Sequence, residues 1–413
     1  MSLAKAAPDD GLPVAAPIPK AAVLPGEAEV SSMVRRLAEE IAPGAAARDL
    51  ERRLPWAELD ALARAGFNSI TVPKAYGGPG VSPATLARAI ADLSAADGSI
   101  GQIPQNHFYA LEVLRIGGTE DQKRFFYGRA LAGERFGNAL AEIGRRDFKR
   151  TTRLSREGAR WHVDGRKFYC TGAIYAHWIP TLAVAEDDGR EVSYLVFVPR
   201  TSPGVTIVDD WDGFGQRVTG SGTVTFEGVP VEPAWVVPFS ASFERPTTIG
   251  PFAQLMHAAI DLGIGEGAYR ETLHFLRDRA RPWIDAKVER ASDDPLTLAY
   301  LGEVHVALRA ADALLGRAGR SVAAAQEAPD EDSVAAASIA VAEARIHTTK
   351  AGLLASNRLH ELSGTSSTME ADDLDRYWRN VRTHTLHDPV RWKYQAVGQY
   401  HLNGRRPSRH GAL

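Results

Sequence analysis

Apolar side chains recur at helical spacing in two parts of the chain. In residues 27–135, one series spaced by three or four positions marks a helix face: Val30, Val34, Leu37 and Ile41. In residues 241–413, two longer series do the same: Leu298, Leu301, Val304, Leu308 and Leu315, then Ile339, Ala342, Ile346, Thr349 and Leu353. We therefore expect an N-terminal helical domain and a C-terminal four-helix bundle.

Residues 136–240 have the pattern of strands instead. Runs rich in β-branched side chains at 192–198, 205–208 and 223–226 alternate with glycine-rich turns. The dipeptide Asp164-Gly165 stands between two β-prone runs and predicts a hairpin turn. The segment is expected to form a β-sandwich or barrel. The fold class is thus α+β, mostly α-helical, with the β domain between two helical ones.

The two ends of the chain lack both periodicities. Residues 1–26 contain five prolines, and Lys and Asp interrupt every apolar stretch, so we expect a flexible tail rather than a secretion signal. The last residues, NGRRPSRHGAL at 403–413, are polar and are expected on the surface.

A glycine string inside the second helical part, Gly263-Ile-Gly-Glu-Gly267, is similar to a dinucleotide-binding fingerprint. No strand precedes it and the surrounding period is helical, which argues against that function. The string therefore indicates close packing between helices.

Charge and cysteine content exclude several classes of function. The 48 basic and 51 acidic residues give a formal net charge of −3, unlike the basic surface of a nucleic-acid-binding protein. The single cysteine, Cys170, supplies neither an intrachain disulfide nor a metal-binding set. No apolar run approaches the roughly 18 residues that a membrane span needs. We expect a cytoplasmic protein that binds neither nucleic acid nor membranes.

Several local strings, taken with the domain order, resemble the acyl-CoA dehydrogenase flavoprotein fold. They are VPKAYGG at 72–78, KFYCTGA at 167–173 and GQRVTGSGTVTFEGVPV at 215–231. A later string, WRNVRTHTLHDPVRWK at 378–393, most resembles the flavin-dependent monooxygenase branch of that fold. Dibenzothiophene monooxygenase and the dimethylsulfone- and methanesulfinate-pathway enzymes belong to this branch.

The resemblance also bears on the dehydrogenase reaction, which needs a carboxylate to remove a substrate α-proton. In the dehydrogenases, the late loop presents that glutamate, whereas here Thr and His surround His384 and His387. Some relatives place the glutamate on the helix near residues 254–263, but residues 249–260 contain no Asp or Glu. Dehydrogenase activity is therefore disfavoured.

His384 and His387 are three positions apart, so both side chains can project to one side of a helix or tight turn. Their spacing alone allows an acid–base pair, a metal site with Asp388, or two surface histidines at a helix end. The resemblance favours the first and no metal. It implies that His387 donates or accepts a proton beside the flavin, with His384 next to it.

Three further residues are implied in flavin contacts. A lone histidine in a helix is usually a core residue, but related monooxygenases have one facing the oxygen-reacting side of the flavin, and His107 matches it. Thr171 takes the place of the family threonine that hydrogen-bonds flavin N5. Asn138 offers an amide donor and acceptor that suit the pyrimidine edge of the ring.

The cofactor phosphate requires donors, and the family supplies an arginine across a subunit boundary. Arg279 and Arg281 stand in the corresponding region, and a guanidinium fork suits phosphate oxygens. Ser366 lies in a Ser-Gly-Thr-Ser-Ser-Thr loop that matches the family's glycine-rich cofactor loop, with hydroxyls replacing glycines. This replacement favours FMN, with FAD as the alternative.

The resemblance implies a two-component monooxygenase. A separate NAD(P)H-dependent reductase would supply reduced FMN, and O2 would add at C4a to give a hydroperoxide in a dry site. The expected substrate is a small or aromatic organosulfur compound. The alternatives are an N- or aromatic hydroxylase, or an acyl-CoA dehydrogenase-like oxidoreductase. The apolar faces of the last helices fit a homotetramer.

Overall fold

The computed structural model describes residues 12–17, 21–143, 149–158, 160–187 and 189–411. Part of the predicted N-terminal tail therefore lies outside the described residues. Residues 12–17 have no regular secondary structure, yet Ala15 is buried and the carbonyl of Ala16 is 3.0 Å from Nε2 of His177. This piece of the tail is attached to the body of the protein.

The N-terminal domain is helical, as predicted. Its helices are α1 (Glu27–Ile41), α2 (Ala45–Glu51), α3 (Trp56–Arg64), α4 (Pro83–Ala96), α5 (Gly98–Gln102), α6 (Gln105–Gly117) and α7 (Glu120–Leu131). The predicted apolar face of α1 is buried along its whole length. Helix α4 begins where Ser82 accepts a hydrogen bond from the backbone N–H of Thr85 and Pro83 occupies the first turn.

The middle of the chain forms a seven-stranded mixed sheet among the described residues, with the order β5-β6-β2-β1-β3-β4-β7. The strands are β1 (Arg153–Glu157), β2 (Arg160–Lys167), β3 (Trp178–Asp187), β4 (Arg190–Pro199), β5 (Val205–Val208), β6 (Thr223–Val231) and β7 (Val236–Pro238). Strands β1 and β3 are parallel and the other pairs are antiparallel.

The hairpin predicted at Asp164-Gly165 is wrong. Both residues lie inside β2, and the pairing with β6 shifts register between Val163 and Gly165, as in a β-bulge. The chain does not turn there because β2 is paired on both sides, with β1 and β6. The hairpin turn instead follows β1, where Gly158 has a φ of +63°.

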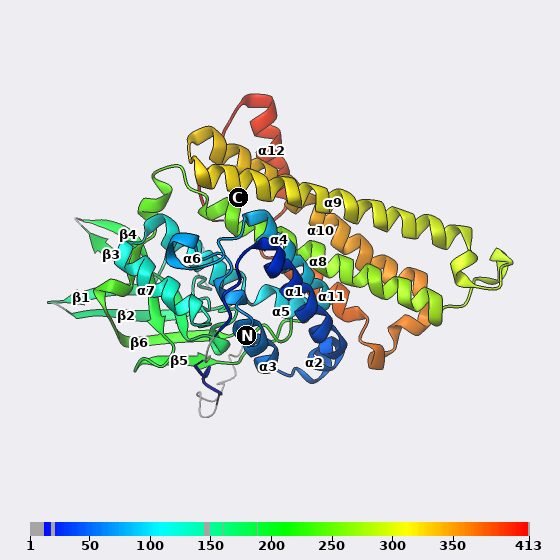
Figure 1. The fold of residues 1–413 in the computed structure, drawn as a ribbon, viewed down its shortest axis with the longest axis horizontal. Coiled ribbons are helices and arrows are strands. Elements are labelled where there is room, and N and C mark those ends of the chain that lie inside the picture. Colours follow the sequence, from blue (N-terminus) through cyan, green and yellow to red (C-terminus); the bar gives the residue numbers. More distant parts are fainter. Residues whose placement is uncertain (1–11, 18–20, 144–148, 159, 188, 412–413) are drawn as a thin grey trace.

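The C-terminal domain consists of long helices, in agreement with the predicted order of helical, β and helical parts (Figure 1). Its helices are α8 (Ile249–Asp278), α9 (Pro295–Glu327), α10 (Glu331–Ser363), α11 (Asp375–His384) and α12 (Arg391–Asn403). Helices α8, α9 and α10 run side by side, and α4 from the first domain packs on α8. Leu298, predicted on the apolar face of α9, is exposed, whereas Val304, Leu308 and Leu315 of the same face are buried.

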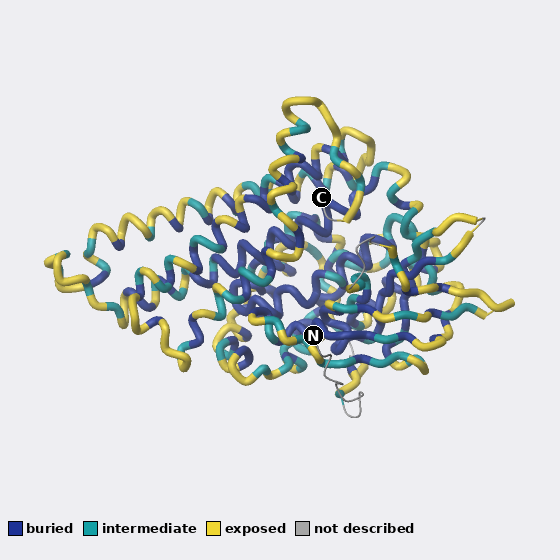
Figure 2. Tube along the Cα trace, turned by 180° about the vertical axis from the view of Figure 1, so that it is seen from behind, coloured by how far each residue is buried: buried dark blue, intermediate teal, exposed yellow. Residues whose placement is uncertain are grey.

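Close helix packing at the glycine string is confirmed. A Cβ on Gly263 would lie 2.2 Å from the carbonyl oxygen of Ala91 on α4, and one on Gly265 would lie 2.9 Å from Cα of Gly352 on α10. Only glycine permits these approaches, so α8 is pressed between α4 and α10. Figure 2 shows the result, with buried segments at the centre of the molecule and exposed positions along the outer side.

Candidate active site

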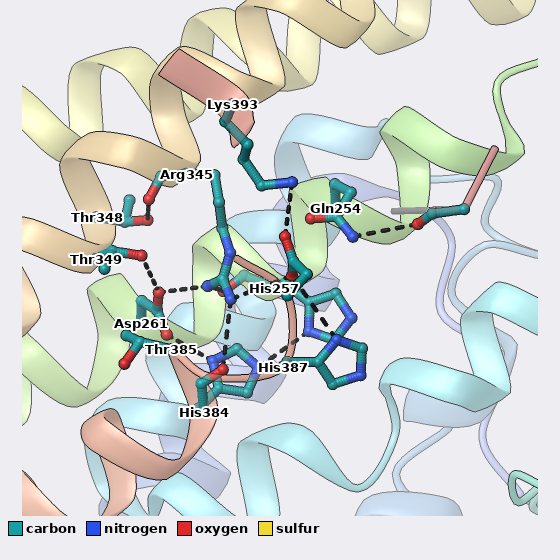
Figure 3. Close-up of polar contacts among 12 residues, drawn as sticks. Gln254, His257, Asp261, Arg345, Thr348, Thr349, His384, Thr385, His387 and Lys393 are labelled. Atoms are coloured by element: carbon teal, nitrogen blue, oxygen red, sulfur yellow. Dashed lines mark hydrogen bonds and ion pairs between the residues drawn. The ribbon is translucent and has the colours of Figure 1, made fainter. Parts of the chain in front are cut away.

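Three histidine rings meet between α8 and the end of α11 (Figure 3). His257 lies in the middle of α8, His384 is the last residue of α11, and His387 follows in the next turn. Nδ1 of His257 is 3.0 Å from Nε2 of His384, and the rings of His257 and His387 have centroids 4.1 Å apart. His257 and His384 are buried, whereas the side chain of His387 is 51% exposed. A ligand can therefore reach only the last of the three.

A buried ion pair between Asp261 and Arg345 lies next to these rings. Asp261, one turn after His257 on α8, accepts hydrogen bonds from Nδ1 of His384 at 2.5 Å, from Thr349 at 2.8 Å and from the Arg345 guanidinium. Arg345 also donates to the backbone carbonyl of His257 at 2.9 Å. Asp261 and Arg345 are both fully buried. Arg345 thus ties α10 to α8 at the level of the histidines.

The expectation that this stretch of α8 carries no carboxylate holds for residues 249–260 but misses Asp261 by one position. The structure shows why this carboxylate does not replace the dehydrogenase base. Asp261 is fully buried, and three side chains already use its oxygens. Two signals in the sequence point to it: its i,i+4 spacing from His257, and an arginine on the apolar face of α10 that needs an acidic partner.

A second carboxylate, Asp388, lies beside His387. Its Oδ1 is 3.7 Å from Nδ1 of His387 and 3.7 Å from the Arg345 guanidinium, and its Oδ2 is 2.7 Å from Nζ of Lys393. Burial would raise the pKa of Asp388, but the neighbouring His387 ring and the charges of Arg345 and Lys393 hold it well below its usual range. Asp388 is therefore a carboxylate at any working pH.

The two buried rings are kept neutral. Burial lowers the pKa of His257 well below its ordinary value, and His387, His384 and Arg345 act in the same direction. Burial also lowers the pKa of His384, although Asp261 partly offsets it. Both rings are uncharged at neutral pH because a buried imidazolium would have to give up its hydration.

A group of hydroxyls lies on the β-domain side. Oγ1 of Thr171 is 2.7 Å from Oγ of Ser221, which is 2.7 Å from Oγ1 of Thr219. Asn138 is close to the same segment, because its amide donates to the carbonyl of Tyr169 at 3.2 Å. Asn138 and Thr171 thus both lie at the short segment 169–171.

One loop connects these hydroxyls to the histidines. The backbone N–H of Gln216, just before Thr219, donates to the side chain of Asn380 at 2.6 Å, and its amide donates to the carbonyl of Gly98 at 3.1 Å. Asn380 is one turn before His384 on α11. The loop therefore places the β-domain hydroxyls and the histidine cluster relative to each other.

The prediction for His107 is not supported by its surroundings. Its Nε2 donates to the carbonyl of Asn68 at 2.6 Å, and its Nδ1 accepts from the backbone N–H of Phe136 at 3.1 Å. The ring is buried, and burial lowers its pKa to about 4. Because both nitrogens are used by the backbone, neither is available to a flavin. His107 is the satisfied core histidine that base rates favour.

This neutral buried ring makes stability depend on pH. Below pH 6.5 the unfolded chain binds a proton at residue 107 while the folded chain does not, so acidification favours unfolding down to the folded pKa of about 4. Between these values, wild type should lose about 3 kcal/mol more unfolding free energy than His107→Gln, which cannot titrate. Urea unfolding at several pH values measures the difference, with exposed His347→Gln as the control. Equal pH dependence in all three proteins would refute the assignment.

The predicted phosphate contacts lie at the far end of α8. Arg279 is engaged by both oxygens of Asp372, at 2.9 and 2.7 Å, whereas Arg281 is exposed and has no polar partner among the described residues. Ser366 lies in a short turn, Thr365–Thr368, directly after α10. The Arg279–Asp372 pair brings the end of α8 against the loop that contains Ser366.

The described part of the C-terminal segment, residues 403–411, lies on the surface, as predicted. Residues 405 and 406 are exposed, and Arg406 and Arg409 pair with Asp332 and Glu331 at the start of α10. Gly411, however, accepts a hydrogen bond at 3.1 Å from the buried amide of Gln254, one turn before His257. The end of the described chain therefore reaches the histidine site.

Two features are absent from the part of the chain that the structure describes. No group of three or more His, Cys, Asp or Glu among them is arranged to hold a metal ion. No helix in the described ranges is both long and apolar enough to cross a membrane.

The order of domains and a polar site where the sheet meets the long helices define a protein of the acyl-CoA dehydrogenase fold. Models of the N-terminal, middle and C-terminal domains of acyl-CoA dehydrogenase match residues 25–134, 144–229 and 255–392. The chain therefore contains all three domains of that fold in the usual order.

Individual relatives show which branch of this family the chain resembles. A dibenzothiophene monooxygenase from Rhodococcus qingshengii is 32% identical over 392 residues, which span 91% of this chain and 94% of the relative. SfnC from Pseudomonas putida, named as a probable FMNH2-dependent monooxygenase, is 31% identical over 91% of this chain and 95% of its own. The crystal structure of FMN-bound TdsC from Paenibacillus sp. A11-2 superposes with a TM-score of 0.89 at 30% identity, covering 93% of this chain and all of TdsC. The chain belongs to the acyl-CoA dehydrogenase family, in the branch of the flavin-dependent monooxygenases.

Proposed function

We propose that this protein is a monooxygenase that uses reduced FMN and O2 to oxygenate a small or aromatic organosulfur compound. The observation that carries the proposal is the histidine cluster. An accessible imidazole, His387, occupies the loop where dehydrogenases present a glutamate, and the neighbouring Asp261 is fully used by Arg345, Thr349 and His384. The names of the relatives support the same reaction and substrate class.

The residues present fit a flavin. Thr171 and Ser221 offer a pair of hydroxyls, and Asn138 is half-buried beside them. Buried oxygens of Gln254, one turn before His257, and of Thr383, directly before His384, have no hydrogen-bond partner among the described residues and can accept a hydrogen bond from a ligand. When bound, reduced FMN supplies the two electrons that activate O2. FMN rather than FAD is favoured by the hydroxyl-rich Ser366 loop and by the FMN-bound structure of TdsC.

His387 is the residue placed to move a proton. Its ring is half exposed on one side, rests on the neutral ring of His257 on the other, and has the carboxylate of Asp388 within 3.7 Å. An imidazolium at this position is compensated by Asp388, and a neutral imidazole is solvated. His387 can therefore accept a proton and return it at one fixed place beside the ligand.

Arg281 is the arginine that we assign to the cofactor phosphate, since Arg279 is already neutralised by Asp372. It precedes an exposed apolar stretch formed by Trp283, Ile284, Leu296 and Leu298. Exposed apolar side chains of this size favour a subunit interface. They support a homotetramer built on the long helices, in which Arg281 reaches the phosphate of a neighbouring subunit. We also propose that a separate NAD(P)H-dependent reductase supplies the reduced FMN and that the protein is cytoplasmic.

The proposed function is tested by supplying chemically reduced FMN, which removes the need for the reductase. The protein, mixed with reduced FMN, ¹⁸O2 and dibenzothiophene or methanesulfinate, should yield product containing one ¹⁸O atom for each O2 consumed productively. Oxidation of an acyl-CoA with an artificial electron acceptor under anaerobic conditions, without oxygenation of either sulfur compound, would contradict the proposal.

A matched pair of variants reports on the cofactor site in the same experiment. Arg281→Gln should weaken FMN binding, measured by flavin fluorescence, by about tenfold, because one charge-assisted hydrogen bond to phosphate is lost. Arg279→Gln should leave FMN affinity within about twofold of wild type. The reverse order would assign the phosphate to Arg279.

A further inference from the structure

The sequence predicts a site at His384 and His387. The structure adds a third ring, His257, which is hydrogen-bonded to His384. We propose that His257 is a positioning residue for His387: the chain Asp261–His384–His257 holds it as an uncharged ring with its proton on Nδ1, so that His387 is the only ring of the cluster that takes up a proton. The inference rests on the role proposed for His387.

The position of each proton follows from Asp261. This carboxylate is paired with Arg345 and can only accept, so Nδ1 of His384, at 2.5 Å, carries a hydrogen. In a neutral His384, Nε2 then has a lone pair and can only accept. The 3.0 Å contact therefore requires a hydrogen on Nδ1 of His257. The remaining nitrogen of His257, Nε2, is left without a proton.

An additional proton could in principle enter this chain and reside on His257 or His384. The charges around the rings argue against it. Asp261 and Asp388 balance Arg345 and Lys393, so the cluster is already neutral with three uncharged rings. A proton on either buried ring would be an excess charge without solvation. His387 is half exposed and faces Asp388, so the proton resides there at lower cost.

These groups come from several elements around the rings. Helix α8 contributes His257 and Asp261, α10 contributes Arg345 and the hydroxyl of Thr349, and α12 contributes Lys393. His384 and Asp388 come from the end of α11 and the turn after it. Burial, and next the charge of Lys393, lower the pKa of His410 of the C-terminal segment, which favours its neutral form.

A neutral ring under His387 has two consequences. The centroids are 4.1 Å apart and the planes are inclined by 37°, so His257 presents its face to the His387 ring. The face of an uncharged aromatic ring attracts a cation and stabilises the protonated form of His387, whereas a second imidazolium would repel it. The hydrogen bond to His384 also stops the His257 ring from rotating. His387 is thereby held in one orientation.

The first test reads the protons directly in the flavin-free, full-length protein. Long-range ¹H–¹⁵N correlation spectra of ¹⁵N-histidine-labelled protein distinguish protonated from bare ring nitrogens, and single variants assign the signals. Between about pH 6 and pH 8, His257 should keep a protonated Nδ1 and a bare Nε2. A doubly protonated His257, or a proton on Nε2, would overturn the inference. This result does not depend on monooxygenase activity.

The second test uses two variants whose expected effects differ between this proposal and the alternative in which His257 shares the proton. His257→Asn keeps an N–H near the position of Nδ1 but removes the ring, so the pH at which His387 becomes protonated should fall by about half a unit. His257→Phe keeps an uncharged ring face, and the same pH should stay within about 0.2 units. If His257 shared the proton, both replacements would relieve repulsion and raise that pH.

Turnover gives an independent check. His257→Asn should lower kcat for oxygenation by about tenfold, a fraction of the 10²–10⁴-fold that an acid or base supplies, with KM within about twofold. His257→Phe should retain more of kcat, and exposed His347→Asn on α10 should match wild type. Equal activity of His257→Asn and wild type would reduce His257 to a core residue. If no variant and not even wild type oxygenates sulfur compounds while the spectra are as expected, the proposed function fails and the histidine chain stands.

Discussion

Replacement of His387 by alanine is expected to lower oxygenation of the organosulfur substrate by about 10²–10⁴-fold, the usual contribution of a positioned acid or base. FMN binding should remain measurable, because the hydroxyls and amide that we assign to the flavin come from the β domain and not from this turn. The fold should also survive, since half of the side chain is in solvent. Stopped-flow oxidation of reduced FMN, with product and hydrogen peroxide quantified together, measures the loss.

The control for this variant is His274→Ala. His274 is also an exposed histidine, 2.8 Å from Asp278 on the same helix as His257, but it lies far along α8. It has the same kind of partner without the neighbouring rings. His274→Ala should oxygenate at the wild-type rate and release no additional peroxide. If His387→Ala did the same, His387 would have no part in the reaction.

Replacement of Arg345 by methionine is expected to cost about 3–5 kcal/mol of unfolding free energy, as for other buried pairs that lose one partner. Arg345 is fully buried and faces Asp261 and Asp388, so its removal leaves two carboxylates with only Lys393 as a compensating charge. It also frees the backbone carbonyl of His257 from a hydrogen bond. Urea unfolding followed by circular dichroism measures the change.

Two variants make this result specific. Arg358→Met on the same helix removes a cation that pairs with Glu303 and Glu361 near the surface, and should cost less than about 1 kcal/mol. The double variant Arg345→Met, Asp261→Leu should recover part of the loss, because the unpaired carboxylate is removed with its partner. A cost for Arg345→Met no greater than that of Arg358→Met would show that the ion pair contributes little.

The two expected effects arise from one arrangement. Asp261 fixes the His384 ring, His384 fixes His257, and Arg345 neutralises Asp261 while binding the backbone at both histidines. A protein that handles a single proton near a reactive cofactor needs its acid and base in defined states before the ligand arrives. The buried charges of this site fix those protonation states in advance, although burying the charges carries a considerable desolvation cost.

Residues that were singled out from the sequence have different outcomes for physical reasons. Asn138 lies at the segment that contains Thr171, because its amide reaches the backbone of Tyr169, and the role of both residues toward a flavin stays a prediction. His107 is placed correctly on α6, but its chemistry depends on which backbone groups lie opposite its two nitrogens. Asp261 and His257 were missed because their i,i+4 spacing on α8 gains meaning only from partners on α10 and α11, which the structure brings together.

The sequence by itself determined the order of helical, β and helical domains, the tight glycine contacts of α8 and the family to which the chain belongs. These properties follow from periodicity, turn residues and local strings, all of which act over a few residues. Tertiary structure alone decided that Asp164-Gly165 lies within a strand and that both ring nitrogens of His107 are hydrogen-bonded to the backbone. It also decided that His257 lies between His384 and His387. Each of these depends on which groups from distant parts of the chain meet in the interior, where every hydrogen-bonding group and charge must find its partner.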